Sequence, residues 1–178
     1  MTAPGSPSLQ LGLGRPCHGW LPVRLAVGGQ VIEFEASDVP QDPVEALVDA
    51  LALAARDVAS TVWWHLEPDG YFFDFQPLPQ VPGTCRLGVC FAPGSSRALA
   101  AEVASVSGDK TAILLPLWRA LRQFQTLATD PLHWPPTTAL TPSLQALRED
   151  LRSPRHAAVA RHPAPAAPAP TRRRRSWE

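Results

Sequence analysis

The chain has 178 residues, 45% of them hydrophobic and 18% charged, which suits one globular domain with some additional polar chain. Sixteen basic and sixteen acidic residues give a formal net charge of zero, so no overall charge favours nucleic acid or an anionic membrane as a partner. The longest strongly apolar stretch, residues 112–121, is interrupted by Pro116 and Arg119 and is too short to cross a bilayer. We therefore expect no transmembrane helix and no membrane partner.

Composition divides the chain into three parts. Residues 1–19 lack the basic start and apolar run of a signal peptide, so we predict a loose N-terminal leader and a cytoplasmic location. Residues 20–152 hold the predicted helices and strands and are expected to form a single α+β domain. Residues 153–178 are rich in Pro, Ala and Arg, and they cannot bury enough apolar surface to offset the entropy cost of ordering, so this tail is predicted to be disordered.

The first predicted elements are a β-hairpin and a helix. Apolar and polar residues alternate on both sides of Gly28-Gly29 within residues 21–37, which predicts a hairpin with a two-residue turn. Asp42 is then placed to cap a helix in which Pro43 takes the first position and Glu45 completes a capping box. The helix has a single apolar stripe for packing on a sheet, formed by Val44, Leu47, Val48, Leu51, Ala55 and Val58.

Further strands and helices follow. Residues 61–75 predict the third and fourth strands, and residues 84–91 predict a fifth because apolar residues alternate with Arg86, Gly88 and Cys90. Residues 97–106 fit either a sixth strand or a short helix, and a strand is favoured.

Two more helices complete the predicted domain. One runs from Asp109 to about Ala128, with Pro116 imposing a kink or a later start. The other covers residues 142–152, capped by Thr141. The expected fold class is therefore α+β, with a single antiparallel sheet of five to six strands in the order β-β-α-β-β-β-(β)-α-α and helices packed on one face.

The third and fourth strands define two faces. A turn at Pro68, Asp69 and Gly70 is expected, in a register that places Trp64 opposite Phe75 and His65 opposite Asp74. The predicted core face consists of Val62, Trp64, Leu66, Tyr71, Phe73 and Phe75. The other face carries Trp63, His65, Glu67, Phe72, Asp74 and Gln76.

The second face combines large aromatic side chains with acids and a His, a combination typical of protein-binding patches. With Arg86 expected opposite Asp74 on the fifth strand, we predict contacts with a protein partner from Trp63, His65, Glu67, Phe72, Asp74 and Arg86. The alternatives are a half-exposed sheet face with aromatic cross-strand packing, or a face covered by a helix.

Enzymatic and metal chemistry receive less support. His65 beside Asp74, with Cys90 on the same side of the sheet, makes a Cys/His-dependent enzyme an alternative, but the predicted register separates Cys90 from the level of His65 by roughly 13 Å. We therefore expect no catalytic residues. Cys17 beside His18 resembles half of a metal site, yet no second pair follows, so no metal and no cofactor are predicted.

A third possibility is a nucleic-acid adaptor that acts through the arginine run at residues 172–175. Four arginines make a weak site, and a solvated tail is favoured, so nucleic acid is not the expected partner.

Two segments carry a resemblance to a known class of proteins. "SDVPQDPVEALVDAL" at 37–51, and "WWHLEPDGYFFDF" at 63–75 with its "EP" turn before an aromatic strand, resemble the small α+β immunity-type proteins of bacterial toxin systems and related uncharacterised bacterial families. The resemblance covers residues 20–128 and implies a non-catalytic protein that binds and neutralises a partner toxin. The Pro/Ala/Arg tail is not part of this pattern, and no toxin-contact residue can be carried over.

Overall fold

The computed structural model describes residues 9–127, 130–136 and 140–152. Their helices and strands are β1 Leu9–Leu13, β2 Trp20–Val27, β3 Gln30–Ser37, α1 Pro43–Ala55, β4 Ser60–His65, β5 Gly70–Pro77, β6 Thr84–Ala92, β7 Ala101–Asp109, α2 Lys110–Phe124 and α3 Leu140–Arg152. Two short 3-10 turns, η1 Pro93–Ser95 and η2 Arg97–Leu99, lie between β6 and β7. The predicted disordered tail, residues 153–178, lies outside the described residues.

The strands form two antiparallel sheets, β1-β2-β3 and β4-β5-β6-β7, so the prediction of a single sheet of five to six strands is wrong. The first hairpin gains its third strand from Leu9–Leu13, within the segment expected to be a loose leader, and thereby completes a sheet of its own. Alternation in a sequence shows which side chains share a face, but it does not show which strand edges pair. The first hairpin accordingly packs against the second sheet instead of joining its edge.

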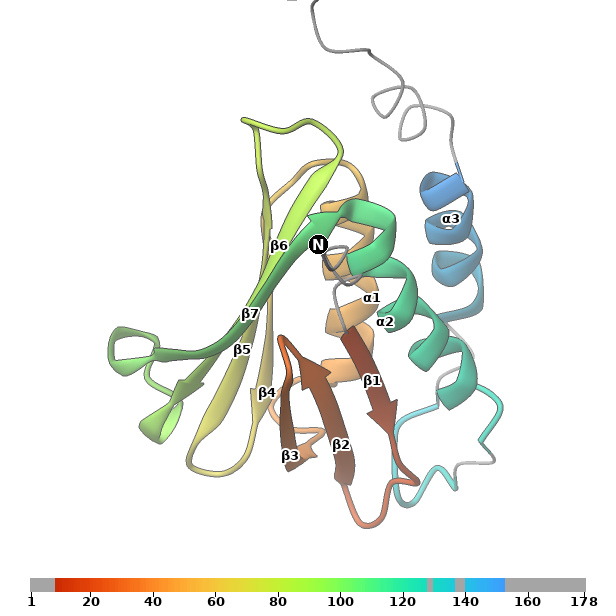
Figure 1. The fold of residues 1–178 in the computed structure, drawn as a ribbon. Coiled ribbons are helices and arrows are strands. Elements are labelled where there is room, and N and C mark those ends of the chain that lie inside the picture. Colours follow the sequence, from red (N-terminus) through yellow and green to blue (C-terminus); the bar gives the residue numbers. More distant parts are fainter. Residues whose placement is uncertain (1–8, 128–129, 137–139, 153–178) are drawn as a thin grey trace, which may run out of the picture.

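The helices and the smaller sheet share one side of the four-stranded sheet. Figure 1 shows α1 and α2 between this sheet and α3. The helix α1 contacts β4 and β5, while α2 contacts β1, β6 and β7. The opposite face of the four-stranded sheet, called the outer face below, is left without a helix among the described elements.

Local sequence signals are confirmed at the ends of several elements. Gly28 and Gly29 form the predicted two-residue turn, with φ angles of 58° and 84° that suit glycine. A side chain at Gly28 would also bring a Cβ within 2.8 Å of the Ser105 carbonyl oxygen, so this turn lies directly against β7. Asp42 accepts a hydrogen bond of 2.8 Å from the Val44 N–H and caps α1 as predicted.

Some predicted boundaries need correction. The helix α1 ends at Ala55, so Val58 is an exposed residue beyond it and not part of the apolar stripe. The helix α2 is continuous from Lys110 and contains Pro116, which excludes a later start. The helix α3 begins at Leu140, so Thr141 is a helical residue and not its cap.

Lys110 connects the start of α2 to the end of α1. Its side chain is only 2% exposed, and its Nζ lies 2.6 Å from Oδ1 of Asp57 and 3.3 Å from the carbonyl oxygen of Ala55. A cation at the C-terminal end of a helix is favourable because the last carbonyl groups carry partial negative charge.

No described helix is both long enough and apolar enough to span a membrane.

Phe34 joins the two sheets. Its ring stacks on Tyr71 at 4.7 Å between centroids, and it meets Trp64 at 5.9 Å and Phe73 at 6.4 Å in edge-on contacts. Aromatic pairs at these distances contribute energy beyond the area that they bury. This cluster explains why the smaller sheet packs on the four-stranded sheet.

We expect the substitution Phe34→Ala to lower the free energy of unfolding by about 2 kcal/mol, because it removes a half-buried ring from the junction of the two sheets. Val31→Ala, at an exposed position of the same strand, should change stability by less than about 0.5 kcal/mol. Urea titration followed by tryptophan fluorescence measures both changes. Equal losses in the two variants would show that Phe34 has no special part in holding the sheets together.

Candidate functional site

The hairpin of β4 and β5 has the predicted faces but not the predicted register. Trp64 pairs with Tyr71 instead of Phe75, a shift of four positions along β5. The turn is closed by a hydrogen bond of 2.8 Å from the Leu66 N–H to the Asp69 carbonyl oxygen, and it contains the cis Glu67-Pro68 peptide bond. The turn is therefore centred two residues earlier than predicted. A shift by an even number of residues leaves each side chain on its original face.

Burial agrees with the predicted faces except at Asp74, which lies on the outer face but is buried. Val62, Trp64, Phe73 and Phe75 are fully buried beneath the helices and the smaller sheet. Trp63, His65 and Phe72 are half-buried on the outer face.

Glu67 does not belong to the outer face. It lies in the turn, where its Oε1 accepts a hydrogen bond of 2.6 Å from the Ser37 hydroxyl at the end of β3. The predicted patch therefore loses one of its two acids, because the turn begins earlier than expected.

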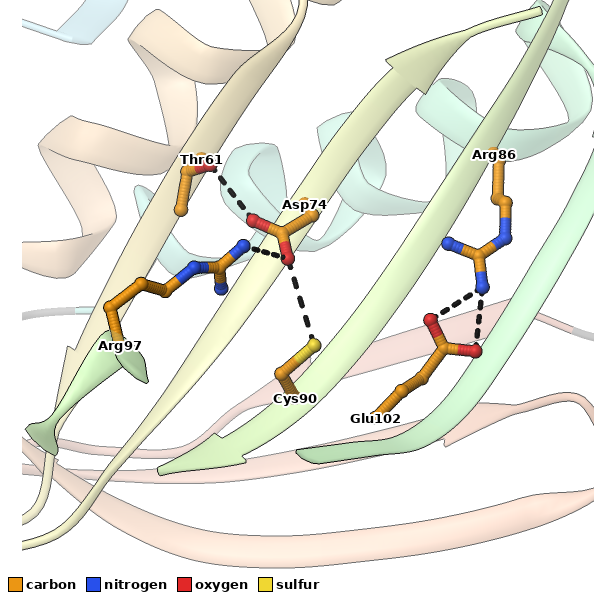
Figure 2. Close-up of polar contacts among 6 residues, drawn as sticks. All are labelled: Thr61, Asp74, Arg86, Cys90, Arg97 and Glu102. Carbon is orange, nitrogen blue, oxygen red and sulfur yellow. Dashed lines mark hydrogen bonds and ion pairs between the residues drawn. The ribbon is translucent and has the colours of Figure 1, made fainter. Parts of the chain in front are cut away.

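Asp74 is the polar centre of the outer face, and it is only 7% exposed. Its Oδ1 accepts a hydrogen bond of 2.8 Å from the Thr61 hydroxyl, and its Oδ2 lies 2.7 Å from Nη2 of Arg97. Figure 2 shows these contacts, with the Cys90 thiol 3.7 Å from the same Oδ2. Burying a carboxylate costs free energy unless hydrogen-bond donors and a counter-charge compensate it, and Thr61 and Arg97 supply both.

Arg97 is a site residue that sequence reasoning missed. It comes from η2, in the connection between β6 and β7, and its guanidinium lies 4.8 Å from the centroid of the Phe72 ring. One side chain thus makes an ion pair with Asp74 and a cation–π contact with Phe72. No local motif marks an arginine in a loop as the partner of a strand residue 23 positions away.

Arg86 pairs with Glu102 and not with Asp74. It lies opposite Gln76, because β5 and β6 are aligned two residues away from the predicted register, and its guanidinium reaches Glu102 on β7. Gly88 lies beneath this pair, and a Cβ there would come within 2.9 Å of Nη1 of Arg86. Hydrogen bonds from Arg86 lower the pKa of Glu102 below its usual range.

The aromatic side chains form a row beside these ion pairs. The rings of Trp63 and Phe72 are nearly parallel, 6.4 Å apart, and Trp63 lies 4.7 Å from the His65 ring. Nδ1 of His65 donates a hydrogen bond of 2.9 Å to the Val39 carbonyl oxygen. We use the name outer-face patch for Trp63, Phe72, Asp74 and Arg97.

Cys90 and His65 are not brought together. Cys90 is level with Phe72 and Trp63 across the sheet, whereas His65 is level with Gly70. His65 and Cys90 lie two strands apart across the sheet and two residues apart along it, so their backbones are separated by roughly 12 Å. Burial, followed by the negative charge of Asp74, raises the pKa of the Cys90 thiol, which is the opposite of what a thiolate nucleophile needs.

Comparison of the chain with protein-family models, curated proteins and solved structures finds no match. Among the described residues, the one group with metal-ligating side chains close enough to share an ion is Cys17, His18 and His133, and it is separate from the outer-face patch.

We expect Asp74→Asn to increase the rate at which iodoacetamide alkylates Cys90 at pH 8 by several-fold. The carboxylate charge raises the pKa of the thiol, so its removal lowers that pKa and increases the fraction of reactive thiolate at a fixed pH. Peptide mass spectrometry follows Cys90 and the exposed Cys17 separately.

Thr61→Val provides the matched control, since it removes a hydrogen bond to Asp74 but keeps the charge. Similar rate increases at Cys90 in both variants would indicate general loosening of the sheet and would contradict the electrostatic explanation.

Proposed function

We propose that this protein is a non-catalytic binding module whose outer-face patch contacts a protein partner. The observation that carries this proposal is the arrangement of Arg97, whose guanidinium is held between the Phe72 ring and the Asp74 carboxylate while its side chain remains 52% exposed. Tryptophan and arginine are among the residues most enriched where a few side chains contribute most of the binding energy.

The patch is held in place before any partner arrives. The Asp74 contact fixes the end of the Arg97 side chain, and Trp63 stacks against Phe72. Side chains that are already ordered lose less conformational entropy on binding, which improves affinity. The patch is also on the face of the sheet that the described helices leave uncovered.

Charge on the outer face is internally balanced. Asp74 is paired with Arg97, and Glu102 is paired with Arg86. A balanced surface does not attract a partner over long distances, so recognition depends on shape and on local hydrogen bonds. This favours a protein surface with its own apolar centre over a polyanion as the partner.

The resemblance of residues 37–51 and 63–75 to immunity-type proteins gives the class of partner to test first, a toxin that the module neutralises in the cytoplasm. Two other functions have weaker support. A Cys/His-dependent enzyme lacks a thiol–imidazole contact between Cys90 and His65. A nucleic-acid adaptor depends on the arginine run at residues 172–175, which lies outside the described residues.

We expect Arg97→Ala to reduce capture of the partner by about tenfold or more, because it removes a central and partly exposed contact. The immobilised wild-type chain and its variants are incubated with lysate of the source cells, and the captured proteins are quantified by mass spectrometry. Asp74 is a poor choice for this test, since its burial makes any substitution a change in stability as well.

Arg24→Ala is the matched control. Arg24 is 53% exposed and pairs with Glu33 at 3.0 Å, but it lies on the smaller sheet. The proposal predicts a protein that wild type and Arg24→Ala retain and Arg97→Ala loses, while thermal melting shows that all three chains are folded. Equal capture by all three, or no specific capture by wild type, would contradict it.

A further inference from the structure

Cys17 and His18 are held together in a tight turn. Cys17 and Trp20 exchange two backbone hydrogen bonds, of 2.9 and 3.0 Å. Between them His18 and Gly19 have φ angles of 50° and 80°, the left-handed pair that closes a two-residue hairpin turn. The backbone therefore fixes the positions from which the Cys17 and His18 side chains extend.

His133 is fixed by a second turn, in the connection between α2 and α3. Its N–H donates to the Asp130 carbonyl oxygen at 2.8 Å, and the Leu132 N–H donates to Oδ1 of Asp130 at 2.9 Å. The next residue, Trp134, is buried and meets Phe124 edge-on at 6.5 Å. The buried indole therefore anchors the turn that presents His133.

The two turns contact each other directly. The Gly19 N–H donates to the His133 carbonyl oxygen at 2.9 Å, and the His18 N–H donates to Nδ1 of His133 at 3.1 Å. The two imidazole rings lie edge to face, 4.6 Å apart. The ligand atoms of Cys17, His18 and His133 all lie within 4.8 Å of one another.

The geometry points to a transition-metal site, of the kind that binds Zn²⁺, formed by Cys17, His18 and His133. One thiolate and two imidazoles are donors that zinc prefers, whereas Mg²⁺ and Ca²⁺ require oxygen ligands. Cys17 and His18 are exposed, so water completes the tetrahedron at the fourth position.

The required movements are small. Ligand atoms on a tetrahedral zinc ion lie roughly 3.3–3.8 Å apart, so the three groups must approach by about 1 Å, which rotation of the exposed Cys17 and His18 side chains supplies. Nδ1 of His133 accepts the His18 N–H, so its lone pair is directed at the other turn. Metal binding at this atom replaces the 3.1 Å hydrogen bond from the backbone N–H of the exposed residue His18, which then bonds water.

Such an ion would connect two parts of the chain that are 115 residues apart, the β1–β2 connection and the α2–α3 connection. Binding energy for a site that exists only in the folded chain is also folding energy. A bound ion would therefore stabilise the folded chain, and its site is separate from the outer-face patch.

The test is a titration of the full, reduced chain with Co²⁺, which reports its ligands by absorption. We expect one Co²⁺ per chain, visible d–d bands typical of tetrahedral coordination and a near-ultraviolet charge-transfer band from the thiolate. Cys17→Ser should abolish the charge-transfer band, and His133→Ala should weaken binding by about tenfold or more. Cys90→Ser, which alters another incompletely buried thiol, should leave both unchanged.

Thermal melting gives a second readout that does not depend on the spectrum. Zn²⁺ should raise the melting temperature of wild type and of Cys90→Ser but not of Cys17→Ser, and Mg²⁺ should raise none of them. The proposal is overturned if wild type binds no stoichiometric Co²⁺, if the band survives in Cys17→Ser, or if Zn²⁺ stabilises Cys17→Ser as much as wild type.

Discussion

The contact between Phe34 and the inner face of the four-stranded sheet is the interaction on which the rest of the arrangement depends. That face presents Trp64, Phe73 and Phe75, which all have to be removed from water. Two helices cover part of it, and the smaller sheet covers the remainder through Phe34. Because three separate elements are committed to one face, the opposite face keeps the polar and aromatic side chains that are available for recognition.

On the outer face, neighbouring side chains bury and pair Asp74, whereas helices and the smaller sheet cover the residues of the inner face. Asp74 is buried by its neighbours on the sheet and by Arg97 from the loop, so its charge is compensated at the surface of the protein and not in the core. Gly88 creates the space over which Arg86 and Glu102 meet. The lack of a side chain at Gly88 therefore matters for the Arg86–Glu102 pair as much as the two charged groups do.

Local features of the fold could be predicted from the sequence, whereas the pairing of distant segments could not. Turn and cap chemistry depends on neighbouring residues, so Gly28-Gly29 and the Asp42 cap were predicted correctly. Alternation likewise placed Trp63 and Trp64 on the right faces. The β4–β5 register was wrong because "LEPDG" can turn at two places, and the structure uses the Leu66–Asp69 turn.

The candidate sites follow the same rule. Trp63 and Phe72 could be assigned to a shared face because they belong to one hairpin with alternating residues. Arg97 and His133 could not be found, since each reaches its partner from a loop whose path is set by the packing of other elements. Spacing along the chain could not detect the contact between His18 and His133, because these residues are 115 positions apart.

The burial of Lys110 has a consequence for the covalent chemistry of the whole chain. It is the sole lysine in the sequence, and its ammonium group is enclosed between the end of α1 and the start of α2. In the folded protein, acylating reagents and the enzymes that attach modifiers to lysine therefore meet no accessible lysine side chain. Acylation of Lys110 requires the α1–α2 junction to separate, so its rate measures how often this part of the molecule opens.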